Sequence, residues 1–153
     1  MVWEEFLEDA KEELKRADHL MYVSLKYTRT VDVIKSIVER LINTYDFAMQ
    51  AMLCLKDIKN IPKIPRLQVE AIKKEYSSHP DNERIKTYLN LYLLLRSIDK
   101  ASFERSLEFR RHVTMTAHLD DKDIEVSIDI IEDYFNKAKE FLNFVEQLTV
   151  QNE

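Results

Sequence analysis

Apolar residues recur at alternating spacings of three and four residues along most of this chain, which is the pattern of amphipathic α-helices. The first such stretch reaches about residue 26, and its apolar positions are Trp3, Leu7, Ala10, Leu14, Ala17 and Met21. The second runs from about residue 31 to about residue 57, after a polar turn in which Thr30 provides an N-cap. Its apolar positions are Ile34, Ile37, Val38, Leu41, Tyr45, Ala48, Met52 and Leu55. We therefore expect two long helices in this part of the chain.

Two further long helices are predicted from the second half of the sequence. The third begins near Asp81 or Asn82, bends or restarts between Asp99 and Ser102, and continues to Arg111. Its apolar positions are Ile85, Leu89, Tyr92, Leu93, Phe103 and Leu107. The last helix has two expected N-caps, Asp120 and Asp121. It carries a seam with seven-residue spacing, formed by Ile124, Ile128, Ile131, Phe135, Ala138, Leu142 and Val145. Such a seam needs a partner helix.

The segment between the second and third helices has a different composition. All three prolines of the chain lie there, at positions 62, 65 and 80. We read residues 59–80 as an insertion with a short helical piece. Four long helices joined mostly by short connections pack as a bundle. The predicted fold is therefore all-α, an antiparallel up-and-down four-helix bundle with a short helical insertion, forming one domain over residues 1–153.

Composition narrows the range of functions. The chain contains no glycine, which excludes the P-loop, the Rossmann fingerprint and the nucleophile elbow and argues against two-residue hairpins. The single cysteine, Cys54, cannot form an internal disulfide, which fits a reducing compartment. The N-terminus is acidic, and the longest apolar runs are about five residues, against about 20 for a membrane span. We expect a soluble, cytoplasmic protein that does not associate with membranes.

The net charge of −5 means that the overall field of the protein does not attract nucleic acid. Binding of RNA would need a local basic surface, and two clusters are candidates. The first surrounds the prolines and comprises Lys56, Lys59, Lys63, Arg66, Lys73 and Lys74. Asp57 and Glu70 dilute it, which favours an ordinary solvated surface of mixed charge. The second cluster comprises Arg105, Arg110 and Arg111.

Metal chemistry has one candidate segment, which runs from His118 to Asp121. Imidazole and carboxylates bind zinc or manganese, but two aspartates that cap the following helix are the simpler interpretation. The motifs Glu-x-x-His, His-Glu-x-x-His and Cys-x-x-Cys are absent from the sequence. We therefore expect neither a metal site nor a cofactor.

Arg111, His112 and His118 are the strongest candidates for chemistry. A permanent cation and a group that exchanges protons near neutral pH can bind a phosphodiester and act on it as acid or base. On one unbroken helix, Arg111 and His118 would share a face, about 20° apart, with Cα atoms separated by about 10 Å. The pair would then not converge. We therefore predict a helix end near residues 114–118 and a homodimer whose second subunit completes the site.

Arg111 and His112 are followed, after five intervening residues, by His118. This order resembles the motif of the HEPN domain family, whose members are small helical bundles. The setting is similar too, because an arginine-rich helix precedes the motif and a capped amphipathic helix follows it. The resemblance implies a homodimer in which two motifs face each other in a cleft, and a metal-independent endoribonuclease that cleaves RNA through 2′-hydroxyl attack on phosphate. It implies that His118 is the general acid or base. Arg111 would hold the phosphate, and His112 would orient it or carry a second proton.

Arg105 and Arg110 are the substrate-binding residues predicted beside this motif. One position departs from the family pattern. Members paired with nucleotidyltransferase antitoxins usually carry a tyrosine two residues after the histidine, where this chain has Asp120. The departure counts against a toxin–antitoxin role with such a partner.

Two other interpretations stay open beside the ribonuclease. One is a non-catalytic HEPN-like module that binds a nucleotide, RNA or a partner protein. The other is a structural helical protein in which Arg111 and His118 are paired with neighbouring carboxylates.

Overall fold

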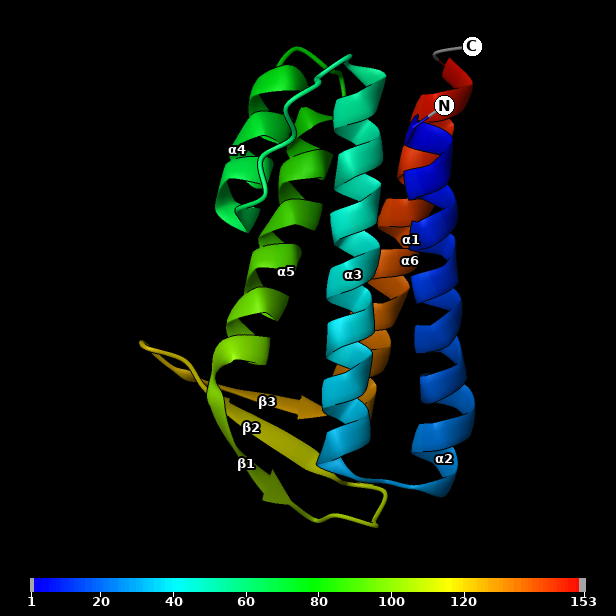
Figure 1. Ribbon diagram of the computed structural model, residues 1–153. Coiled ribbons are helices and arrows are strands. Elements are labelled where there is room, and N and C mark those ends of the chain that lie inside the picture. Colours follow the sequence, from blue (N-terminus) through cyan, green and yellow to red (C-terminus); the bar gives the residue numbers. More distant parts are fainter. Residues whose placement is uncertain (1, 152–153) are drawn as a thin grey trace.

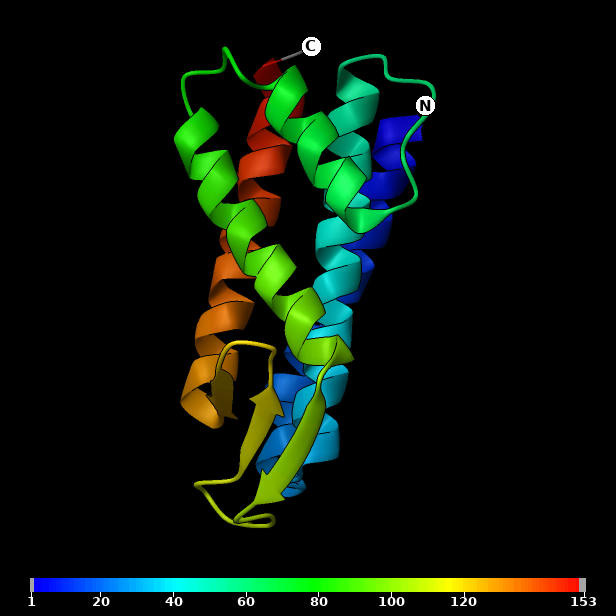
Figure 2. The ribbon, with the colours of Figure 1, turned by 90° about the vertical axis from the view of Figure 1, so that its left-hand side faces the viewer.

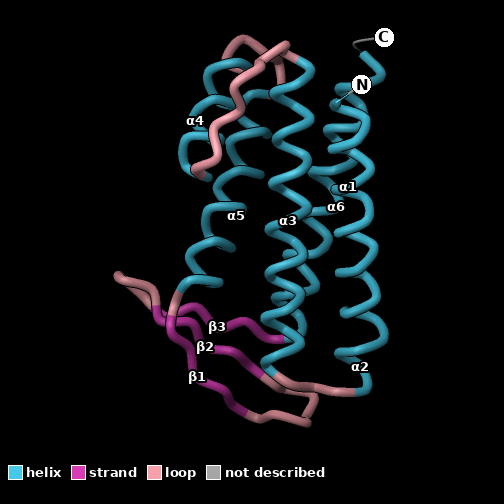
Figure 3. The backbone as a smooth tube through the Cα atoms, viewed as in Figure 1, coloured by secondary structure: helices cyan, strands magenta, loops and turns pink. Residues whose placement is uncertain are grey.

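Long helices and a small antiparallel sheet make up the fold, which a computed structural model describes over residues 2–151 (Figure 1). The helical elements are α1 (Val2–His19), the π-helical η1 (Leu20–Ser24), α2 (Leu25–Tyr27), α3 (Val31–Leu55), α4 (Pro65–Glu75), α5 (Asn82–Lys100) and α6 (Ile128–Gln151). Between α5 and α6 lie the strands β1 (Ser102–Ser106), β2 (Thr114–His118) and β3 (Asp123–Ser127). Figure 3 shows the strands gathered at one end of the helical part.

The first two predicted helices are present. The elements α1, η1 and α2 follow one another as a single helical rod that ends at Tyr27, and α3 runs back beside it (Figure 1). Thr30 is the N-cap of α3, where its side-chain oxygen accepts a hydrogen bond from the backbone N–H of Val33 at 3.3 Å. The polar turn thus ends one helix and begins the next, as its capping chemistry requires.

The short helix expected in the proline-containing segment is present as α4. Pro65 occupies its first turn, where the missing N–H of proline costs no hydrogen bond. The Tyr76 hydroxyl donates a buried hydrogen bond of 2.8 Å to the backbone carbonyl of Met52 in α3. This bond ties the end of α4 to the main helices.

The prediction of an all-α four-helix bundle is wrong between residues 101 and 127. The third helix does not continue to Arg111, because Ala101 has extended backbone angles and β1 begins at Ser102. The three strands pair antiparallel in the order β1-β2-β3. Residues 114–118 and 123–127 alternate strictly between polar and apolar side chains, which is the period of a half-buried strand and not of a helix.

The last helix also begins later than predicted. Asp120 and Asp121 do not cap it, because they lie in the connection between β2 and β3. That connection is closed by a hydrogen bond of 2.9 Å from the N–H of Leu119 to the carbonyl of Lys122. Instead, the Ser127 hydroxyl accepts a hydrogen bond from the N–H of Ile130 at 3.3 Å, at the first turn of α6. Ser127 therefore provides the helix cap that was expected from Asp120 and Asp121.

The sheet forms without glycine because its connections are longer than two residues. Residues 107–113 join β1 to β2, and Leu107 and Phe109 take positive φ angles of 54° and 65° there. On the inner face of the sheet, Met115, Ala117 and Val126 are buried in the common core. The outer face is polar, as the alternation requires. Figure 2 shows the sheet lying beside the N-terminal half of α3, below the end of α5.

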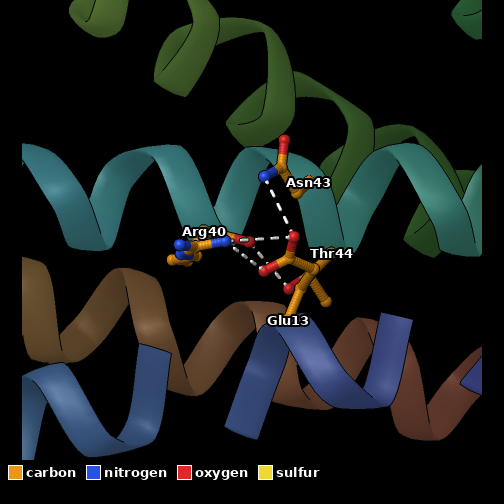
Figure 4. A network of polar contacts seen from close by, with 4 residues as sticks. All are labelled: Glu13, Arg40, Asn43 and Thr44. Carbon is orange, nitrogen blue, oxygen red and sulfur yellow. Dashed lines mark hydrogen bonds and ion pairs between the residues drawn. The ribbon is translucent and has the colours of Figure 1, made fainter. Parts of the chain in front are cut away.

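The buried residues form one connected hydrophobic cluster, in which the rings of Tyr45 and Phe141 stack 4.9 Å apart. A polar contact joins α1 to α3 beside it (Figure 4). There, the Glu13 carboxylate accepts hydrogen bonds from Arg40 at 3.0 Å and from Asn43 at 3.2 Å. Within residues 2–151, no helix is both long and apolar enough to cross a membrane.

Candidate functional site

The structure places Arg111 and His118 at opposite ends of β2. Arg111 lies in the 107–113 loop before the strand, and His118 is the last residue of the strand. From Thr114 to His118 alone, an extended strand rises about 13 Å. Neither residue lies on a helix, so the predicted helix end near residues 114–118 is wrong. The two groups of the motif do not meet within one chain.

His118 is held between two carboxylates from the neighbouring strands. Its Nδ1 lies 2.9 Å from Asp123 Oδ1 on β3, and its Nε2 lies 3.3 Å from Glu104 Oε2 on β1. The hydrogen bond to Asp123, together with the negative charges of Asp123 and Glu104, raises the pKa of His118 above its usual value. Both ring nitrogens therefore face carboxylates. The interpretation as a structural protein expected the same of Arg111, which has no carboxylate within 4.0 Å in the described residues. The histidine joins the three strands across the outer face of the sheet.

Arg105, a predicted substrate-binding residue, is also engaged in contacts within the chain. Its guanidinium lies 2.9 Å from Asp32 and 3.7 Å from Glu108, and the hydrogen bond to Asp32 raises its pKa. Glu108 in turn accepts a hydrogen bond of 3.0 Å from the N–H of Val31, at the start of α3. This arrangement fixes the β1 end of the 107–113 loop to α3.

The rest of the loop is anchored at two further points. The N–H of Phe109 donates a hydrogen bond of 2.6 Å to the carbonyl of Arg29, in the connection between α2 and α3. Val113 is fully buried, and its N–H donates to the carbonyl of Arg110 at 3.0 Å. The loop therefore has a defined backbone, although its side chains between these points face solvent.

The hydrogen bond between Phe109 and Arg29 brings the loop to the connection that follows α2, and we name the exposed basic and aromatic residues of the two segments the basic-aromatic tip. It comprises Lys26, Tyr27, Phe109, Arg110 and Arg111, and all five are exposed. Its two aromatic residues are the most exposed large hydrophobic residues in the described part of the chain, at 79% for Tyr27 and 75% for Phe109. In the described part of the chain, no carboxylate lies within 4.0 Å of the Arg110 or Arg111 guanidinium. His112 is exposed beside them.

A cavity of about 410 Å³ adjoins the tip, between the η1–α2 rod and the first turns of α6. Its apolar walls include Tyr22 and Ile128, and its charged groups are Lys26, Arg29 and Glu132. The Arg29 Nε atom is buried and has no hydrogen-bond partner within residues 2–151. A buried donor without a partner is costly. An acceptor on a ligand in this cavity would relieve that cost.

Of the predicted cluster, Arg110 and Arg111 are exposed in the loop, while Arg105 pairs with Asp32 and Glu108. The sequence pattern did not single out Tyr27, Phe109 or Arg29. Phe109 stands between charged residues and off the apolar face expected for a helix through Phe103 and Leu107, and this was a usable signal. Nothing in the sequence indicated that residues 29 and 109 are in contact.

Metal ligation at the segment from His118 to Asp121 has no support in the geometry. Asp120 and Asp121 are exposed in the turn, while the ring nitrogens of His118 face Asp123 and Glu104. In the part of the chain that the structure describes, no group of three or more histidine, cysteine or acidic side chains is arranged to hold a metal ion.

Cationic and aromatic side chains are thus exposed on the two segments that the hydrogen bond between Phe109 and Arg29 joins. The resemblance of the Arg111, His112 and His118 motif to the HEPN family stays a prediction. Comparison of the chain with protein-family models, with curated proteins and with solved structures finds no match.

Proposed function

We propose that this protein binds single-stranded nucleic acid at the basic-aromatic tip and does not cleave it. The observation that carries the proposal is the pairing of two exposed aromatic side chains, Tyr27 and Phe109, with two exposed arginines that have no carboxylate partner in the described residues. Stacked bases and bound phosphates need these two kinds of group side by side.

The aromatic side chains favour a single strand over a duplex. A ring stacks on the face of a base only when that face is free, and each such contact contributes about 1 to 3 kcal/mol. Phe109 is presented by a loop whose backbone bonds to Arg29 and whose Val113 is buried. Little backbone freedom is then lost on binding, which favours affinity.

The charges of the tip supply contacts to phosphate. Arg110 and Arg111 present planar guanidinium groups that match phosphate oxygens in pairs. Lys26 and Arg29 extend the positive charge to the neighbouring cavity, whose volume of about 410 Å³ lies in the range of small-ligand sites. With a net charge of −5, the protein would bind through this local surface and not through its overall field.

The positions of the motif residues favour binding without cleavage. A ribonuclease of the expected kind needs Arg111 and His118 at one phosphate, but β2 separates them and His118 is bonded to Asp123 and Glu104. A second chain would have to bring its His118 to Arg111. The endoribonuclease, the homodimer and a nucleotidyltransferase partner therefore stay predictions that depend on such an assembly.

Fluorescence anisotropy with a labelled oligouridylate tests the proposal. Phe109→Ala should weaken binding about 5- to 100-fold, because one stacking contact is lost. Arg111→Gln should weaken it and reduce the slope of log affinity against log salt concentration by about 0.7, the value for one phosphate contact on a single strand. The matched controls are Val150→Ala and Lys139→Gln on α6, both exposed and outside the tip.

Other probes separate the alternatives. An oligothymidylate should bind about as well as the oligouridylate, because stacking and phosphate contacts do not read the 2′-hydroxyl, whereas an RNA duplex should bind more weakly. Incubation of the RNA in EDTA should leave it intact. Fragments with cyclic phosphate ends that disappear in His118→Ala would instead establish the ribonuclease. Equal binding by wild type, Phe109→Ala and Arg111→Gln would refute the tip as the binding site.

A further inference from the structure

We infer that a second site, independent of the tip, binds the phosphate group of a small phosphomonoester such as a nucleoside monophosphate. It is a pocket of about 440 Å³ between the first turn of α4 and the last two turns of α5. Figure 2 shows these two helix ends near each other. Three cationic side chains line the pocket, namely Arg66, Arg96 and Lys100. Arg66 belongs to the proline-region basic cluster, which the sequence pattern alone assigned to ordinary surface.

Arg96 is held in place by groups behind the pocket. Its Nη2 donates to Asp46 Oδ2 at 2.7 Å, and its Nε donates to the Tyr92 hydroxyl at 3.0 Å. The Tyr92 hydroxyl in turn donates to Asp46 at 2.5 Å. A guanidinium has five N–H donors, so these contacts leave three of them for a ligand. A planar donor group that is already oriented binds phosphate with little further ordering.

Arg66 and Lys100 are the free charges of the pocket. Both are exposed, and neither has a carboxylate within 4.0 Å in the described residues. Lys100 lies one helical turn after Arg96 on the same face of α5. These two residues therefore add positive charge to the pocket that the oriented Arg96 lines.

The charge balance of the pocket matches a phosphate dianion. Three cations and one carboxylate, Asp99, line it, which gives +2. The neighbouring ion pairs leave this balance unchanged, because Asp46 lies against Arg96 and Lys35 lies 3.2 Å from Asp99. A phosphomonoester carries a charge of about −1.5 to −2 near neutral pH. A carboxylate or a phosphodiester, with a single negative charge, would neutralise only about half of the positive charge of the pocket.

The apolar walls of the pocket favour a phosphate group attached to an organic molecule over inorganic phosphate. Ile64, Pro65 and Leu93 provide apolar surface beside the cations, and Ser97 adds a hydroxyl. The volume is several times that of a phosphate group and lies in the range of small-ligand sites. A sugar or a base attached to the phosphate would lie against these apolar residues.

Isothermal titration calorimetry with uridine monophosphate, inorganic phosphate and uridine tests the site on the full chain. The monophosphate should bind most tightly, inorganic phosphate more weakly, and uridine not measurably. Arg66→Gln and Lys100→Gln should each weaken binding of the monophosphate about ten-fold or more, the effect of losing one charged hydrogen bond. Lys74→Gln, a neutralised surface lysine of α4 that does not line the pocket, should bind like wild type.

Two results would overturn the inference. The first is the absence of saturable binding of either phosphate compound. The second is binding of the monophosphate that is unchanged in Arg66→Gln but lost in Arg111→Gln, which would assign the phosphate to the tip. Circular dichroism of each variant verifies its fold, and both substituted side chains of the pocket are exposed, so folding should be unaffected. Since nucleic-acid binding at the tip uses other residues, either proposal can fail alone.

Discussion

Phe109 has a backbone φ of 65°, a conformation in which a Cβ atom is disfavoured. Glycine, which adopts this conformation without strain, is absent from the chain. The surrounding structure must therefore hold the loop, through the hydrogen bond from Phe109 to Arg29 and the burial of Val113. We expect Phe109→Gly to be more stable than Phe109→Ala by about 1 kcal/mol, since both remove the exposed ring but only glycine removes the strain. Urea unfolding measures the difference. If alanine is the more stable residue, the positive φ is not maintained in solution.

His118 makes the stability of the sheet depend on pH. Because the hydrogen bond to Asp123 raises its pKa in the folded state above 6.5, protonation of His118 stabilises the fold. This contribution is fully present below about pH 6.5 and is lost as the pH rises through the raised folded pKa. The melting temperature of wild type should therefore exceed that of His118→Gln most at acidic pH, and the difference should shrink on going to alkaline pH. Asp123→Asn should reduce the same pH dependence. Parallel curves of melting temperature against pH for wild type and both variants would rule out a stabilising interaction between protonated His118 and the neighbouring carboxylates.

At the level of elements, hydrophobic periodicity predicted the helices and missed the sheet. Helix α3 was predictable because its apolar positions and its Thr30 cap agree. The strands were missed because the lack of glycine argued against hairpins, and because Ile124 continues the apolar seam of α6 into β3. The alternation in Thr114–His118 was visible in the sequence. The segment is only five residues long and follows a predicted helix, which favoured the helical period of 3.6 residues over the strand period of two.

Substitution by lysine should change the free energy of unfolding very differently at two adjacent positions of β2, because one side chain faces solvent and the next faces the core. Thr116 faces outward between Glu104 and Glu125 on the neighbouring strands, so Thr116→Lys should be neutral or stabilising by up to about 1 kcal/mol. Ala117 is fully buried, so Ala117→Lys should cost more than about 4 kcal/mol or prevent folding. Denaturant unfolding compares the two. Similar effects at both positions would contradict the strand register.

For the whole molecule, the candidate site could be predicted only in part. The run from Arg110 to His112 was identified as a functional candidate, and its side chains are exposed. The aromatic partner Tyr27 and the cavity beside Arg29 depend on a contact between residues 29 and 109, which local sequence patterns do not reveal. The same holds for His118, whose carboxylate partners follow from the strand register. Residue types were readable from sequence, but their spatial neighbours required the tertiary structure.

The Glu13 contact between α1 and α3 separates global stability from binding at the tip (Figure 4). The Glu13 side chain is 12% exposed and accepts hydrogen bonds from Arg40 and Asn43. Glu13→Ala should lower the free energy of unfolding by about 1 to 2 kcal/mol, because a mostly buried charged hydrogen bond is lost. Glu8→Ala is the control. Its carboxylate, 73% exposed, pairs with Lys11 at 3.7 Å, so its removal should cost at most about 0.5 kcal/mol.

Oligouridylate affinity of Glu13→Ala, measured well below its melting temperature, should equal that of wild type, because α1 takes no part in the tip. The structure supports this independence, since the tip is held by contacts among residues 29, 31, 108, 109 and 113. A variant that loses stability and keeps affinity would show that the tip needs only its local anchors. If affinity falls together with stability, the helical rod and the 107–113 loop act as one cooperative unit, and the local anchors alone do not keep the tip in its binding conformation.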